Sequence, residues 1–195
     1  MTLHRIGFLG SVACALCVGA CAPLVPYTLE EPTRGTTGVQ EERVLYEWYD
    51  DHGPGEVTVR INLGAQRAYY QRGGRPIGWS FVATGIEGRK TPRGTFKIQE
   101  KIVDKESNRY GWIEDYYGNV VDDDASPGDY TPPETRYVPA PMPYWQRLTS
   151  YGIGMHAGII PEPGEPASHG CIRLPKPLAP ILFEVTKEGT RVTIE

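Results

Sequence analysis

Short runs of alternating apolar and polar residues, separated by turns rich in glycine and proline, limit the fold of this chain most strongly. The run 57–63 alternates with the period of two that a half-buried β-strand requires. Further strands are predicted at 66–71, 77–84, 95–101 and 191–194. Because 23 glycines and 18 prolines interrupt the chain, a helical bundle is disfavoured. The sequence therefore predicts a mostly β fold in which consecutive strands form a meander.

Two segments depart from this strand pattern. Residues 177–185 suit one short helix, because proline is tolerated in the first helical turn, where Pro177 lies. Between 103 and 149 the periodicity fails, which predicts a long loop. A loop of that length inside a compact domain is commonly a lid or a binding loop. The alternative is an insertion held down by its own aromatic side chains, and we weigh the two equally.

Within this long loop, aromatic and acidic residues are the features of interest. Tyr144 and Trp145 are candidate substrate-binding residues, since loop aromatics often grip a ligand. The acidic run 122–124 lacks the spaced ligands of a calcium-binding loop, so we interpret it as solvated charge.

Length, charge and cysteine content narrow the class of protein. A chain of 195 residues suits one domain with a short appendage. The net charge of -4 provides no basic field to hold phosphates, so no nucleic-acid partner is expected. Three of the four cysteines, Cys14, Cys17 and Cys21, lie near the N-terminus. Cys171 is thus alone in the folded part, which excludes an intramolecular disulfide framework there.

The N-terminal residues have the features of an export signal. The apolar run 6–20 is shorter than the roughly 20 residues that a membrane-spanning helix needs. It ends in Val18-Gly19-Ala20-Cys21, which resembles a bacterial lipobox, in which the cysteine becomes the N-terminal residue and carries lipid. The alternative is an ordinary secretory signal that is cleaved nearby.

These features predict three segments and a location. We expect a signal peptide at 1–20, a lipid-anchored flexible linker at 21–55 and a folded catalytic domain at 56–195. A short aromatic cluster at 43–49 is interpreted as a lead-in without function. The protein would be exported and held at the bacterial cell envelope through Cys21, facing the periplasm if the cell has an outer membrane.

The residues suited to chemistry lie between 156 and 173. A cysteine nucleophile needs a base or a cationic neighbour that raises its thiolate fraction. His169 lies two residues before Cys171, and in a strand the two side chains would share a face. His156 can return beside the thiol from a neighbouring strand, and Arg173 can grip a carboxylate in a two-pronged contact.

Two less reactive interpretations of these residues stay open at this stage. One is a zinc site built from the two histidines and the cysteine, although no fourth ligand is obvious and the spacing is not that of a finger. The other is a purely structural cluster, in which Cys171 is a small buried hydrophobe.

The same residues resemble the signature of the L,D-transpeptidases with a YkuD-type catalytic domain. That signature is a histidine, a spacer, and then Ser/Thr-His-Gly-Cys followed by an aliphatic residue and Arg or Asn. Here it is His156, the spacer 157–167, and Ser168-His169-Gly170-Cys171-Ile172-Arg173. The segment 91–96, with the sequence TPRGTF, resembles the family's TPxGxF motif. The resemblance covers about residues 57–195.

The resemblance implies a fold and a reaction. The fold would be a β-sandwich or barrel with a short helix, and the cysteine would lie at the base of a groove under a lid. The substrate would be a peptidoglycan tetrapeptide stem, with roles in cell-wall organisation and cell shape. The cysteine would attack the third, diamino residue, expel the terminal D-Ala and pass the acyl group to an amine acceptor, such as a stem peptide or an anchored wall protein.

The resemblance also implies roles for individual residues. Cys171 would be the nucleophile and His156 its base, oriented by a backbone carbonyl. His169 and Gly170 would shape the oxyanion environment, Arg173 would meet the donor carboxylate, and Ser168 would contact substrate. The family needs no metal or organic cofactor.

Two other functions remain open from the sequence. Water could resolve the same acyl-enzyme, giving an L,D-carboxypeptidase or a cross-link hydrolase. Alternatively, the chain could be a non-catalytic peptidoglycan-binding lipoprotein. The presence of all the reactive residues weighs against the second function.

Overall fold

A computed structural model describes residues 43–195 of the chain. The expected signal peptide, the lipidation residue Cys21 and most of the expected linker lie outside these described residues. No helix within 43–195 is long and apolar enough to cross a membrane.

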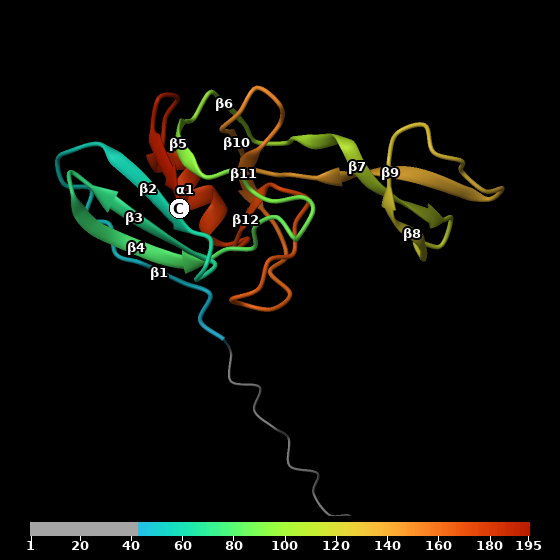
Figure 1. The fold of residues 1–195 in the computed structure, drawn as a ribbon, viewed down its shortest axis with the longest axis horizontal. Coiled ribbons are helices and arrows are strands. Elements are labelled where there is room, and N and C mark those ends of the chain that lie inside the picture. The colour runs from blue at the N-terminus through green and yellow to red at the C-terminus, as the bar shows by residue number, and fades with distance from the viewer. Residues whose placement is uncertain (1–42) are drawn as a thin grey trace, which may run out of the picture. The chain divides into compact units, whose positions relative to one another are not determined.

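Two β-sheets form the body of the described structure (Figure 1). The larger sheet has the strand order β1-β4-β3-β2-β13-β5, and the smaller has the order β12-β11-β10-β6. The larger sheet comprises β1 (Tyr46–Trp48), β2 (Val57–Asn62), β3 (Arg67–Arg72), β4 (Arg75–Phe81), β5 (Gly94–Lys97) and β13 (Arg191–Ile194). The smaller comprises β6 (Glu100–Ile102), β10 (Trp145–Arg147), β11 (Gly154–Ala157) and β12 (Ile172–Leu174).

The hydrophobic core joins both sheets and the single described helix, α1 (Leu178–Val185). Along β2 every second side chain is buried, as the alternation predicts. Those side chains share one cluster with residues of β11, β12 and α1, which include Met155, Leu174 and Leu182. Ile172 and Leu174 of β12 belong to this core, so the core anchors the strand that directly follows the reactive motif.

A third sheet extends from the body as an arm, defined here as residues 106–141 (Figure 1). It contains β7 (Glu106–Asp115), β8 (Val120–Ala125) and β9 (Thr135–Pro141), in the order β8-β7-β9. The prediction of a loop without regular structure at 103–149 is therefore wrong, because this segment contains β7, β8 and β9. β8 in particular could not be predicted, because it is almost wholly exposed and lacks the alternation on which the prediction relied.

In the body, several sequence predictions agree with the structure and two do not. The fold is mostly β, the helix begins one residue after Pro177, and the last strand has the predicted bounds. The strand predicted at 95–101 is two strands, β5 and β6, which belong to different sheets. The cluster at 43–49 contributes β1, which pairs antiparallel with β4, so the folded structure begins upstream of residue 56.

Candidate active site

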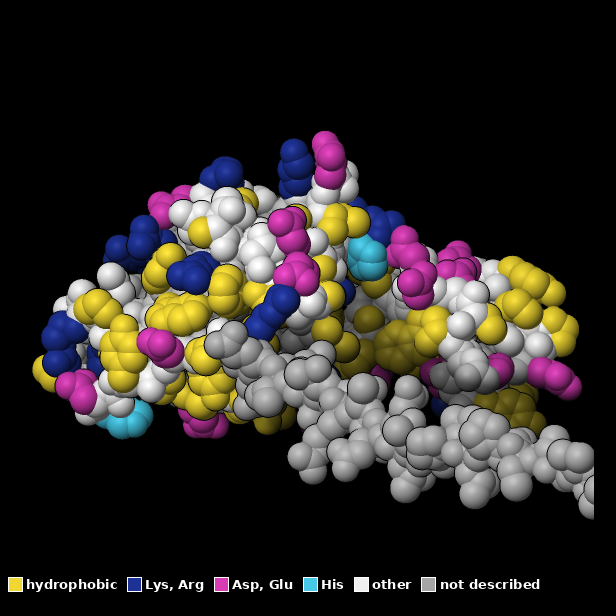
Figure 2. Space-filling view, turned by 90° about the horizontal axis from the view of Figure 1, so that it is seen from below, with side chains coloured by type: hydrophobic (Ala, Val, Ile, Leu, Met, Phe, Trp, Pro, Cys, Tyr) yellow, Lys and Arg dark blue, Asp and Glu magenta, His cyan; other side chains and the backbone are white. Residues whose placement is uncertain are grey.

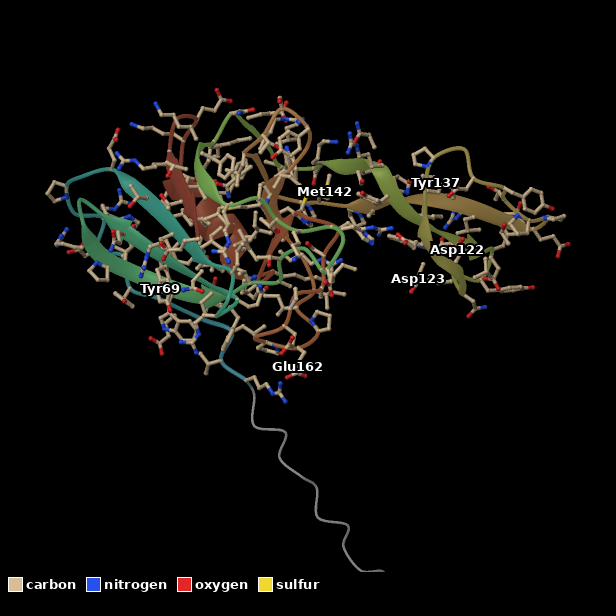
Figure 3. The ribbon with its side chains drawn as sticks, in the orientation of Figure 1. Tyr69, Asp122, Asp123, Tyr137, Met142 and Glu162 are labelled. Atoms are coloured by element: carbon tan, nitrogen blue, oxygen red, sulfur yellow. The ribbon has the colours of Figure 1, made fainter. Side chains whose placement is uncertain are left out.

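The strand that carries the candidate base His156 lies beside the strand that follows the candidate nucleophile Cys171. β11 and β12 pair in parallel, with His156 opposite Arg173, and Cys171 immediately precedes β12. Together with Ser168 and His169, these residues line a cavity of about 620 Å³. The cavity continues onto the arm, and Met142, at the junction of arm and body in Figure 3, is also part of its lining.

His156 is a buried histidine with a defined tautomer. Its Nδ1 lies 2.8 Å from the carbonyl oxygen of Ala157. Because a carbonyl only accepts, Nδ1 carries the hydrogen in the neutral ring. Burial lowers the pKa of His156 from 6.5 to about 4, so the ring is neutral near pH 7. Nε2 therefore keeps a lone pair and can take a proton.

Cys171 is held as a neutral thiol. Burial raises the pKa of its side chain above the ordinary value. The sulfur lies 3.6 Å from the carbonyl oxygen of Gly152, to which the S–H donates. Among the described residues no hydrogen bond joins this sulfur to His156. The structure thus holds a neutral thiol and a neutral imidazole in one cavity, and not a thiolate–imidazolium pair.

The turn that precedes the cysteine is fixed by the Ser168 hydroxyl. Its oxygen accepts a hydrogen bond from the Gly170 amide at 3.1 Å and donates to the Cys171 carbonyl at 2.5 Å. Gly170 has a φ of 117°, a conformation that side chains other than glycine rarely adopt. The Gly170 amide is therefore engaged within the turn.

His169 contacts the arm through its ring. Residues 169–171 form a bend and not a strand, so the expectation that His169 and Cys171 share a strand face is wrong. The ring of His169 stacks on Tyr110 at 4.5 Å between centroids. Its Nε2 lies 3.2 Å from Asp124, a carboxylate that also accepts two hydrogen bonds from Arg89.

These four residues, Arg89, Tyr110, Asp124 and His169, are termed the arm latch below. Asp124 belongs to the acidic run that the sequence analysis interpreted as solvated charge; the residue is exposed, but it also pairs with Arg89 and contacts His169, which the sequence did not predict. Burial lowers the pKa of His169, and the Arg89 guanidinium lowers the pKa of Asp124. Near neutral pH the contact therefore brings a neutral imidazole against an ionised carboxylate at 3.2 Å and is not an ion pair.

Arg173 supplies positive charge at the base of the cavity. Its guanidinium donates to the carbonyl of Ile159 at 3.4 Å, and no carboxylate among residues 43–195 forms a salt bridge with it. Burial lowers its pKa, since the charged form is partly removed from water. An anion that enters the cavity can therefore pair with this charge.

The comparisons with known proteins agree with this arrangement. A family model described as YkuD, the L,D-transpeptidase catalytic domain, matches residues 56–194. The chain belongs to this family. No curated protein matches the chain by sequence.

Solved structures of family members share the fold. An L,D-transpeptidase from Mycobacterium smegmatis is 19% identical, with a TM-score of 0.54 over 72% of this chain and 59% of that one. The catalytic domain from the E. faecium L,D-transpeptidase is 22% identical, with a TM-score of 0.50 over 72% and 97%. LD transpeptidase LdtMt1 in complex with imipenem is 19% identical, with a TM-score of 0.54 over 71% and 58%. The chain thus spans about three fifths of the length of the M. smegmatis and LdtMt1 chains.

The two aromatic candidates differ in their placement relative to this YkuD-type site. Trp145 lines the cavity, and its ring lies 6.2 Å from that of His156. It is 1% exposed and its Nε1 donates to Glu100 at 3.2 Å, so it forms part of the wall beside the base. Tyr144 does not line the cavity and packs against Phe183 of α1. The structure therefore does not bring Tyr144 to the site.

Sequence analysis missed several residues that shape the YkuD-type site. Arg89 and Tyr110 lie far from the signature in sequence and meet it only through the fold. Thr91 begins the TPRGTF segment, which gave a signal of family membership but not of a role. Among residues 43–195 no group of three or more His, Cys, Asp or Glu side chains could hold a metal ion.

Proposed function

We propose that this chain is a peptidoglycan L,D-transpeptidase that forms an acyl-enzyme on Cys171. The observation that carries the proposal is that a partly buried thiol, a neutral imidazole whose Nε2 keeps its lone pair, and a guanidinium with no salt bridge among residues 43–195 line one cavity. Such a set can attack a carbonyl, take up the thiol proton and bind a carboxylate. Membership of the YkuD family supplies the substrate class.

The proposed acylation step follows from these atoms. The Cys171 sulfur attacks the carbonyl carbon of the third stem residue, forming a C–S bond, while its proton moves to Nε2 of His156. The carbonyl electron pair moves onto oxygen and then returns, breaking the C–N bond to the terminal D-Ala. The leaving amine takes the proton from His156. An acceptor amine then repeats the sequence in reverse and releases the sulfur.

The resting state fits a base that acts only when substrate is bound. Because both groups are neutral, proton transfer from Cys171 to His156 separates charge inside a buried cavity. The developing imidazolium would donate through Nδ1 to the Ala157 carbonyl, which stabilises it. Arg173 would offset the donor carboxylate, and its half-buried charge makes that pairing stronger than one at the surface.

The decisive experiment is turnover of a tetrapeptide stem with product identification by mass spectrometry. A transpeptidase yields a cross-linked product with an added amine, whereas a carboxypeptidase yields only the tripeptide and D-Ala. The absence of any turnover and of any acyl adduct on Cys171 would leave only a binding role. Imipenem, which is bound in the LdtMt1 structure, serves as a second probe, because a covalent adduct mapped to Cys171 reports acylation without an acceptor.

Export and lipid anchoring are also part of the proposal. The lipobox-like Val18-Gly19-Ala20-Cys21 supports attachment of the mature chain to a membrane of the cell envelope. Cys21→Ser should shift the protein from the membrane to the soluble fraction, because the acyl attachment point is lost. If the variant still fractionates with membranes, the anchoring is not through Cys21. An anchored wall protein remains one possible acceptor for the enzyme.

A further inference from the structure

The catalytic turn 168–171 rests on a second loop that the proposed mechanism does not use. That loop comprises residues 84–91 and bonds the turn through its backbone. The Ser168 amide donates to Thr84, and the Ile86 amide donates to Ser168, each at 3.0 Å. A Cβ at Gly85 would lie only 2.9 Å from the Gly170 Cα, so the two segments are in close contact.

Thr91 provides the side-chain link between the two segments. It is 4% exposed and does not line the cavity. Its hydroxyl accepts a hydrogen bond from the Gly85 amide at 2.9 Å and donates to the Gly170 carbonyl at 2.8 Å. One hydroxyl therefore ties the supporting loop to the peptide group that joins Gly170 to Cys171.

This contact sets the direction of the Cys171 amide. A trans peptide is planar, and its C=O and N–H point to opposite sides; the described residues contain no cis peptide. Because the Gly170 carbonyl points at Thr91, the Cys171 N–H points away from it. Thr91 lies behind the turn and Cys171 lines the cavity, so the amide is directed to the cavity side.

The other polar backbone groups of Gly170 and Cys171 are already bonded. The Ser168 hydroxyl accepts a hydrogen bond from the Gly170 amide and donates one to the Cys171 carbonyl. The Thr91 hydroxyl donates to the Gly170 carbonyl. Among residues 43–195 no partner is found for the Cys171 amide, so this amide remains to meet the oxygen of a carbonyl under attack by its own sulfur. Donors fixed in place before the reaction stabilise a developing oxyanion most effectively.

We propose that Thr91 is a positioning residue, which orients the Cys171 amide toward the oxyanion by holding the Gly170 carbonyl. The inference rests on the proposed acyl-transfer function, since it concerns the oxyanion of that reaction. Thr91 itself contacts neither substrate nor the reacting atoms. Its effect should therefore fall on steps that form an oxyanion and spare steps that need only the sulfur nucleophile.

The test compares two reactions of the same thiol in the wild type, Thr91→Val and Thr91→Ser. p-Nitrophenyl acetate acylates a thiol through a tetrahedral oxyanion, whereas iodoacetamide alkylates it by direct displacement. In Thr91→Val we expect acylation to fall about 10- to 100-fold, because losing one oxyanion donor outright costs about 100- to 1,000-fold. Alkylation should stay within about twofold of the wild-type rate, and Thr91→Ser should restore most of the acylation rate.

Stem turnover adds a second signature. Thr91→Val should lower kcat and leave KM nearly unchanged, because the interaction is made only in the transition state. If the wild type fails to turn over the stem, the proposed function fails, while the acylation-to-alkylation ratio still tests Thr91. Thr91 has no positioning role if that ratio is unchanged in Thr91→Val, or if both rates fall together.

Stability is controlled with a matched variant. Thr190 is also a buried threonine, 6% exposed, and its hydroxyl accepts the Lys187 amide at 3.0 Å, remote from the turn in sequence. Thr190→Val should lower the melting temperature without changing the acylation-to-alkylation ratio. If Thr91→Val does not fold, Thr91→Ala replaces it, since it lacks the hydroxyl and leaves room for a water to satisfy the backbone groups.

Discussion

The body and the arm of this protein are both β-structure, but they are stabilised differently. In the body, the inward side chains of β2, Val57, Val59 and Ile61, are at most 5% exposed and join a core shared by both sheets. In the arm, five of the six residues of β8 are exposed. Apolar side chains gather at its free end in Figure 2, and Tyr117 is 93% exposed.

This difference in burial shows which interactions stabilise the body and which hold the arm in place. The body gains its stability from apolar burial, which is non-directional and roughly proportional to the apolar area removed from water. The arm has little buried apolar surface beyond Ile113 and Ala125, so its position relative to the body depends more on polar contacts. The arm latch is the clearest of these, because it joins both β7 and β8 to the catalytic turn.

The largest predicted effect is a loss of activity without a loss of stability, caused by substitution of Cys171. Cys171→Ala should abolish stem turnover and imipenem adduct formation, because the nucleophile is removed and a smaller side chain fits the site. The melting temperature should change little, so loss of activity is not loss of fold. Turnover by this variant above the background of an empty preparation would exclude the cysteine mechanism.

Core and arm substitutions should differ sharply in stability. Ile61 is fully buried, so Ile61→Ala should lower the free energy of unfolding by about 3 kcal/mol. Tyr117→Ala, at the exposed end of the arm, should change it by less than about 0.5 kcal/mol. Denaturant unfolding measures both. A loss of several kcal/mol in Tyr117→Ala would mean that the arm end is covered in solution, which would end the distinction drawn here.

This contrast also explains what the sequence could predict. Alternation reports one-sided burial, so it located β2 and β13 in the body and missed β8, where neither face is buried. The signature predicted Cys171, His156 and Arg173 as site residues, and the structure brings all three to one cavity because β11 and β12 are paired. The partners of His169 could not be found, because Tyr110 and Asp124 reach it through a fold of the arm that no local pattern records.

The charge state of His156 predicts a pH-dependent stability. Its pKa is about 4 in the folded chain and 6.5 as an ordinary value. Between these values the unfolded chain binds a proton that the folded chain excludes, so stability falls as the pH decreases from 6.5 to 4. The full contribution, about 3 kcal/mol, is present above pH 6.5 and lost below pH 4.

His156→Gln provides the comparison for this pH effect. The variant cannot gain the proton, so its unfolding free energy should decline less than that of the wild type between pH 7 and pH 4.5. The difference in decline should be about 2–3 kcal/mol. Parallel curves for the two proteins would show that His156 is not buried as a neutral ring. Carboxylates affect both proteins equally and cancel in the difference.

The smallest predicted effect tests the arm latch itself. The Arg89 and Asp124 side chains are 37% and 48% exposed, so solvent screens their pairing and the contact adds little to the free energy of unfolding. Asp124→Asn should therefore leave the melting temperature almost unchanged. It should speed hydrogen exchange of arm amides and raise KM by up to about fivefold, because the arm forms part of the cavity wall.

Two further variants test whether the loss of the arm latch causes the increase in KM. Glu134→Gln removes one carboxylate charge from the same arm, yet Glu134 is exposed, forms no salt bridge among residues 43–195 and does not line the cavity. It should leave KM at the wild-type value. Arg89→Gln should reproduce the effect of Asp124→Asn, and the double variant should add little, since both changes break the shared Arg89–Asp124 contact. Additive effects, or an equal response to Glu134→Gln, would show that arm charge and not the latch controls substrate binding.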